Sequence, residues 1–140
     1  MGAKREVQTI NWVIFTLFSL AALVSAGSTF SSLRSLTPEQ EREGQSSLSI
    51  HWEEGDTIFA CMLGVLITLM IVRWKWLFPH NVPLTVIMGG ICYAFLFQVT
   101  TAGWVGLMGF IGFLIAAVAG IIMMLIYALG EKHWRLREHK

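Results

Sequence analysis

Charged side chains are scarce in this sequence and unevenly spread. Only 14% of the 140 residues are Asp, Glu, Lys or Arg, whereas typical soluble domains have about a quarter. Between Lys75 and Glu131 the sequence has no charged residue at all. A soluble fold has no need of so long an uncharged stretch, but a chain that crosses a bilayer does. The net charge of +1 also excludes the basic face with which a nucleic-acid-binding protein neutralises phosphates.

The sequence also lacks the residue patterns of most catalytic and cofactor chemistry. Within the apolar stretches the charged residues are Arg73 and Lys75. Both lie near one end of their stretch, where their side chains can extend to the membrane surface. The sequence therefore lacks the ionisable group that a pump holds in the middle of the membrane. Cys61 and Cys92 lack CxxC spacing, and no histidine pair, phosphate loop, nucleophile elbow or HExxH motif occurs within a span. We therefore expect no enzyme activity, no catalytic residue, no metal site, no cofactor and no small-molecule substrate, while a bound lipid is compatible with the sequence.

Four apolar stretches are present, each close to the roughly 20 residues that a helix needs to cross a hydrocarbon core of about 30 Å. They cover residues 11–30, 57–77, 83–101 and 104–129. Helix is the expected conformation because lipid offers no partner for backbone N–H and C=O groups. The sequence therefore predicts an all-α, multi-pass membrane protein with one membrane domain, residues 1–140, and four transmembrane helices.

The first stretch has a second interpretation as a cleaved secretory signal. Lys4 and Arg5 precede it, and the small residues Val24, Ser25 and Ala26 resemble a cleavage site. Because the apolar run is long for a signal peptide, we expect the segment to remain as a membrane helix.

Basic residues favour one orientation of the four helices. Eight of the ten Lys and Arg residues would lie on the side of the two termini, and Arg34 and Arg42 on the other side. The positive-inside rule then places both termini in the cytoplasm, in an inner- or plasma-type membrane. Tryptophans favour the depth of the headgroups and would mark the two interfaces. Those expected inside are Trp12, Trp74, Trp76 and Trp134, and those expected outside are Trp52 and Trp104.

The predicted connections differ in length. Residues 102–103 leave almost no loop, so the third and fourth helices should form an antiparallel hairpin. The external loop, residues 31–56, is the one sizeable aqueous segment and is rich in acidic residues. Within it, Thr37 and Pro38 predict the start of a short external helix that ends near Glu43.

Two further boundaries follow from the residues beside the apolar stretches. Asp56 is expected to cap the second membrane helix at its N-terminus. Residues 130–140 carry mixed charges and are expected to form a cytoplasmic tail.

Small residues recur at helical spacing and predict close helix packing. Two faces stand out, one formed by Gly109, Gly112, Ala116 and Gly120 and the other by Ala60 and Gly64. Such faces let helices approach closely, so that dispersion acts where no hydrophobic effect drives association. Two interpretations stay open, which are packing inside this bundle and docking of another protein.

Gln98 is the most polar side chain of the third stretch and shares a helix face with Gly90 and Ala94. We expect it to point into a helix contact and to make an interhelical hydrogen bond of about 1 kcal/mol or less. A permeation path or a ligand contact is the alternative role.

These features favour a non-catalytic accessory subunit of a larger integral membrane protein complex, whose partners are other membrane subunits and the lipid bilayer. Its small-residue faces and acidic external loop would provide the docking surfaces. A small homo-oligomeric channel or transporter is the alternative, and an immunity, exclusion or lysis-type membrane protein is a third hypothesis. The four-helix topology occurs in many unrelated proteins and does not choose between them.

Overall fold

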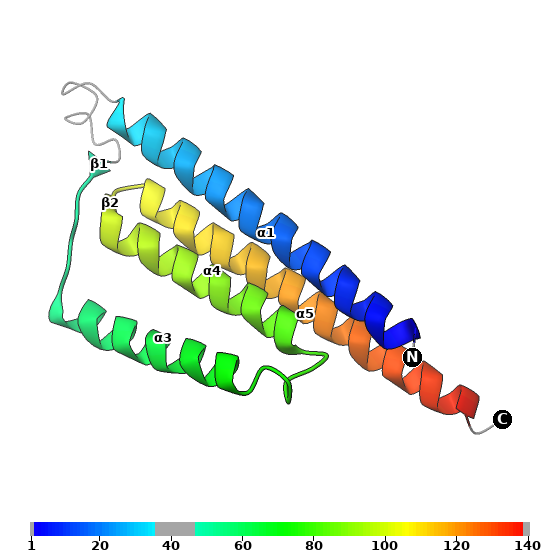
Figure 1. The fold of residues 1–140 in the computed structure, drawn as a ribbon. Coiled ribbons are helices and arrows are strands. Elements are labelled where there is room, and N and C mark those ends of the chain that lie inside the picture. The colour runs from blue at the N-terminus through cyan, green and yellow to red at the C-terminus, as the bar shows by residue number, and fades with distance from the viewer. Residues whose placement is uncertain (1, 36–46, 139–140) are drawn as a thin grey trace.

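Four long helices make up most of the computed structural model, which describes residues 2–35 and 47–138, with side chains for residues 9–35 and 47–129. They are α1 (Gly2–Arg34), α3 (Glu54–Val72), α4 (Asn81–Thr100) and α5 (Val105–Glu138). Each contains a segment long and apolar enough to cross a membrane, which confirms the four predicted helical stretches. Figure 1 shows α1, α4 and α5 side by side, with α3 set apart from them.

The predicted end of the second membrane helix, residue 77, is wrong, and α5 continues beyond its apolar segment, Val105–Leu129. Helix α3 ends at Val72 and residues 73–80 form turns, so Arg73 and Lys75 lie beyond the helix. Helix α5 runs to Glu138, through most of the segment predicted as a tail. Hydropathy reports where a chain is apolar, whereas a helix continues through polar residues of good helix propensity until something stops it. Residues 131–138 contain neither Gly nor Pro.

The chain before α3 closes over one end of the bundle. Strand β1 (Ser47–Leu48) pairs antiparallel with β2 (Thr101–Ala102), which lies between α4 and α5. The N–H groups of Ser49 and His51 donate to the carbonyls of Thr100 and Val99, at 3.2 and 2.9 Å. The last carbonyls of a helix have no partner within it, so this segment satisfies those of α4. The external helix predicted from Pro38 to Glu43 lies outside the described residues.

Helix α3 begins one turn earlier than predicted. Its N-cap is Glu53, and Asp56 is the third residue of the first turn. The Asp56 carboxylate accepts a hydrogen bond from the Glu53 N–H, at 2.9 Å. Asp56 therefore stabilises the helix start from inside the helix, as the acidic half of a capping box, because a carboxylate three residues on can reach back to the N-cap N–H.

Helices α4 and α5 form an antiparallel hairpin held at close range by glycines. Gly90 of α4 lies against Ala116 of α5, and Gly109 of α5 lies against Phe97 of α4. The later residue of α4 thus contacts the earlier residue of α5, which shows that the two helices are antiparallel. The turn between them contains Gly103 with φ of 84°, a conformation that favours glycine.

Helix α1 packs along the hairpin, parallel to α4. Near its N-terminal end, Phe15 and Phe18 pack against the core cluster that includes Val86. Further along, Ser25 Oγ and Tyr93 Oη are 3.0 Å apart, and the Phe30 ring stacks on Phe97 at 5.5 Å. These contacts place residues 30–31 of α1 at the same depth as residues 97–98 of α4.

Asn11 is a polar exception inside this apolar packing. Its side chain is only 1% exposed, and both amide atoms lack a hydrogen-bond partner within the described chain. Asn11 lies one turn before Phe15, on the face of α1 that packs on the hairpin. Its neighbour Trp12 contacts Trp74 at 6.2 Å, so two tryptophans predicted for the same interface meet at one end of the bundle.

Candidate helix-docking groove

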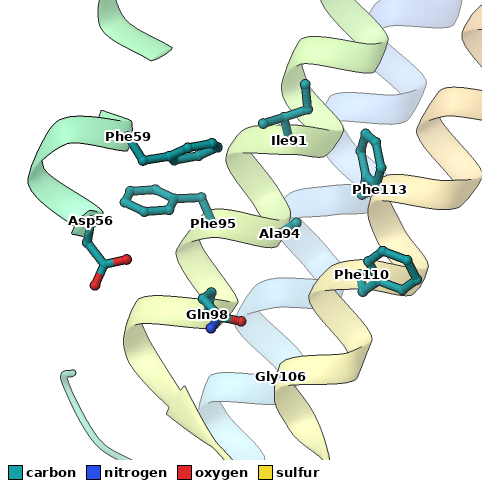
Figure 2. A pocket seen from close by; sticks show the side chains of 9 residues that line it. All are labelled: Asp56, Phe59, Ile91, Ala94, Phe95, Gln98, Gly106, Phe110 and Phe113. Carbon is teal, nitrogen blue, oxygen red and sulfur yellow. The ribbon is translucent and has the colours of Figure 1, made fainter. Parts of the chain in front are cut away.

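A groove of about 460 Å³ lies between α3, α4 and α5, near the turn that joins α4 to α5. Figure 2 shows its lining, with phenylalanine rings contributed by all three helices. We call it the α3–α5 groove, and it is lined by Asp56, Phe59, Ile91, Ala94, Phe95, Gln98, Gly106, Phe110 and Phe113.

The position of α3 creates the groove. Helix α3 meets α4 through aromatic contacts near its start, where Phe95 lies 5.1 Å from Phe59 and 6.1 Å from Trp52. The indole N–H of Trp52 donates to Thr57 Oγ1 at 2.8 Å, which holds its ring in place. Leu63 is the one buried residue of α3, whereas seven residues of α4 are buried. Helix α3 therefore rests against the hairpin at one end and leaves the space beside it open.

Two polar side chains lie at the mouth of the groove. Figure 2 shows the Asp56 carboxylate and the Gln98 carboxamide at the same end, beyond the rings of Phe59 and Phe95. Gln98 is exposed, and its side chain makes no hydrogen bond to any described residue. The interhelical hydrogen bond expected for Gln98 is therefore absent from the described part of the chain. Asp56 keeps its bond to the Glu53 N–H but has no ion-pair partner among the described residues.

The structure places the small residues of α5 against α4. A Cβ atom added at Gly109 would lie 2.6 Å from Phe97 Cβ, and one added at Gly112 would lie 2.6 Å from the Tyr93 ring. One added at Gly120 would lie 2.5 Å from Ile87 Cγ1, and Ala116 is buried beside Gly90. This face of α5 is therefore covered within the chain.

The small residues of α3 have a different environment. Gly64 is exposed, and a Cβ atom added there would meet nothing within 4 Å. Ala60, one turn earlier, is half-buried. In the described structure this face of α3 is left open to a further neighbour.

The remaining tryptophans divide between the two ends of the bundle. Trp52 and Trp104 lie at the end that contains the α4–α5 turn, whereas Trp76 lies in the turns after α3, beside Trp74. Trp76 and Trp104 are both largely exposed. The sequence predicts Trp134 as a further anchor, and its side chain lies outside those that the structure describes.

The aromatic lining was not foreseen from the sequence. Phe110 and Phe113 are three residues apart on α5, as are Phe95 and Gln98 on α4, and residues at that spacing share a helix face. This spacing was the available signal. It could not reveal that both faces, together with Phe59, border one groove, because the position of α3 is a tertiary property.

Within the described residues, no three His, Cys, Asp or Glu side chains are grouped so that they could hold a metal ion. Comparison with known protein families, with curated proteins and with solved structures finds no match for this chain. The residues of the groove are therefore the starting point for a functional proposal.

Proposed function

We propose that this chain is a non-catalytic subunit of a larger integral membrane complex, and that a transmembrane helix of a neighbouring subunit docks in the α3–α5 groove. The carboxamide of Gln98 carries the proposal. It lies in a membrane-spanning segment, lines the groove, and has no hydrogen-bond partner in the described chain. Lipid tails cannot supply that partner. At this end of the helix water competes for the carboxamide, whereas a polar side chain on a neighbouring helix supplies a fixed partner.

Exposed apolar side chains alone would not support docking, because lipid tails are as apolar as leucine. The α3–α5 groove differs from a lipid-facing surface in its concave shape and in its polar mouth. Carboxylates gather there, since Asp56 lines the groove and the exposed Glu53 and Glu54 stand at the start of the same helix. A partner helix with hydrogen-bonding or basic groups at this level is therefore favoured over a lipid chain.

The open face of α3 adds a second contact. Gly64 lets a neighbouring backbone approach closely, as small residues do in membrane helix interfaces. A helix seated in the groove would also cover phenylalanine rings. Interhelical hydrogen bonds in membranes contribute about 0.6 kcal/mol on average and up to about 1.7. Gln98 would therefore add selectivity to an interface held mainly by packing.

The proposal is tested by releasing the tagged chain from its native membrane in several mild detergents and measuring the size of the particle. We expect a complex larger than one chain with its detergent. Gln98→Leu should reduce its recovery about threefold, the factor that corresponds to the loss of a hydrogen bond of about 0.6 kcal/mol. Thr85→Val is the matched control, since Thr85 is a polar residue of the same helix as Gln98, lies outside the groove and donates its hydroxyl to the Asn81 carbonyl of its own helix.

Two results would contradict the proposal. The first is recovery of a stable single chain under every condition. The second is equal recovery of the complex from Gln98→Leu and from the native sequence, which would show that the groove faces lipid.

A further inference from the structure

The outer side of α1 is a helix face that no other described element covers, and its residues change from apolar to polar along the helix. One side of α1 packs on the hairpin through partly buried side chains. No residue in the most apolar part of its spanning segment is fully buried. Exposed residues at spacings of three and four form a continuous line on the other side. We call them the outer stripe of α1, and they are Leu17, Leu20, Val24, Gly27, Ser31 and Arg34.

The outer stripe of α1 changes from apolar to polar toward the end of the bundle that contains the groove. Leucines and valine lie deepest, followed by Gly27, then Ser31, then Arg34 at the last residue of the helix. A Cβ atom added at Gly27 would meet nothing within 4 Å, so this position offers room for a close neighbour. Neither Ser31 nor Arg34 has a side-chain partner among the described residues.

The α3–α5 groove has the complementary order. Phenylalanines line its deeper part, and Gln98 and Asp56 lie together at its mouth. Among the side chains that the structure describes, Arg34 is the one Lys or Arg at this end of the bundle. From this complementarity we infer that the helix docking in the groove is α1 of a second copy of this chain, an inference that rests on the function proposed above.

Depth in the membrane supports the same pairing. Within one chain, Phe30 stacks on Phe97, which places Ser31 at the depth of Gln98. Two copies inserted in the same orientation lie at the same depth, so Ser31 of one copy is level with Gln98 of the other. Arg34 is three residues further along, about 4.5 Å at 1.5 Å per residue. Its long side chain leans back toward the helix N-terminus, which is toward the level of Gln98 and Asp56. Helix α1 of the second copy also runs parallel to α4, as equal orientation requires.

The contact joins two different surfaces, because each copy offers one groove and one outer stripe. Such heterologous contacts close into a ring when the rotation between neighbours permits it. The copies then share one orientation about an axis along the membrane normal. The proposed subunit therefore has at least one neighbour of its own kind.

Cysteine cross-linking between two differently tagged copies tests this pairing in native membranes. The native thiols are first removed as Cys61→Ala and Cys92→Ala; both cysteines are free in the structure. One copy then carries Ser31→Cys and the other Gln98→Cys. We expect a mixed-tag dimer after mild oxidation or a short thiol cross-linker. Leu107→Cys replaces Gln98→Cys in the control, because Leu107 is exposed at the same end of α5 but does not line the groove.

Charge reversal supplies a second readout on the same cross-link. Arg34→Glu on the first copy should lower the yield about twofold to fivefold, the range expected for an exposed ion pair of up to about 1 kcal/mol. Asp56→Arg on the second copy should restore it. If the chain with Asp56→Arg fails to accumulate, Asp56→Asn replaces it on the second copy. Paired with a first copy that keeps Arg34, Asp56→Asn should lower the yield of the cross-link.

The outcomes separate this inference from the function on which it rests. A mixed-tag dimer that responds to charge reversal supports both. A cross-link from Gln98→Cys to a different polypeptide overturns docking of a second copy and leaves the proposed function standing. A single chain whose Gln98→Cys thiol reaches only lipid-soluble reagents overturns both.

Discussion

Replacing Gly109 by alanine should separate α4 from α5 and weaken the bundle. The added methyl carbon would lie 2.6 Å from Phe97 Cβ and 3.2 Å from both the Cα and the carbonyl oxygen of Ala94. Favourable carbon contacts lie at about 3.5–4.0 Å, so the closest of these is about 1 Å too short. Neither Cβ nor backbone atoms can move by rotating a side chain, so the two helices themselves must shift. Overpacking of this kind costs about 1–3 kcal/mol.

Gly89→Ala is the matched control for this prediction. Gly89 also lies within a helix, and a Cβ atom added there would meet nothing within 4 Å. Both variants gain the same helix propensity, about 0.5–1 kcal/mol, so the difference between them isolates the steric term. Unfolding by SDS in mixed micelles, followed by tryptophan fluorescence, should show Gly109→Ala less stable than Gly89→Ala by about 1–3 kcal/mol. Coincident unfolding midpoints would refute the close approach of the two helices.

Two further predictions concern polar groups inside the bundle. Asn11→Leu should stabilise the protein in the same unfolding assay, because it removes a buried amide that has no partner among the described residues and whose desolvation costs about 1–3 kcal/mol. Asn81→Leu should destabilise the protein, since Asn81 Oδ1 accepts a hydrogen bond from the Val82 N–H at 2.9 Å. Equal changes in the free energy of unfolding would contradict the finding that Asn81 has a hydrogen-bond partner and Asn11 has none in the described part of the chain. Ser25→Ala and Tyr93→Phe should each cost about 0.6 kcal/mol, and the double variant no more than either, because the two hydroxyls share one interhelical hydrogen bond. Additive effects would show that the two hydroxyls act independently.

The four long apolar helices could be predicted from the sequence because their cause is local. A backbone in lipid must satisfy its own hydrogen bonds, so an uncharged stretch of sufficient length becomes a helix whatever its neighbours are. Helix ends were less predictable. Residues 131–138 continue α5 because their propensity allows it, although their charges end the apolar stretch. The two-residue pairing of β1 with β2 carries no periodic pattern that a sequence could display.

For the candidate groove, too, the sequence predicted some features and left others to the tertiary structure. The sequence singled out Gln98 as the most polar side chain of its span, and it identified small residues whose spacing puts them on one helix face. It could not show that Gly109 and Gly120 lie against α4 while Gly64 remains open, because that depends on which helices become neighbours. It also gave no reason to associate Asp56 with Gln98, which lie on different helices.

Composition and spacing alone determined that this chain forms four helices long and apolar enough to cross a membrane, since the requirement of lipid for an apolar, self-bonded backbone acts on each segment separately. The sequence also predicts the orientation of the helices from its basic residues. Tertiary structure decided that α1, α4 and α5 pack together while α3 stands apart, because packing depends on how whole helix surfaces fit one another. Among the described residues, that arrangement leaves the Gln98 side chain without a hydrogen-bond partner beside four phenylalanine rings, and it leaves Arg34 exposed.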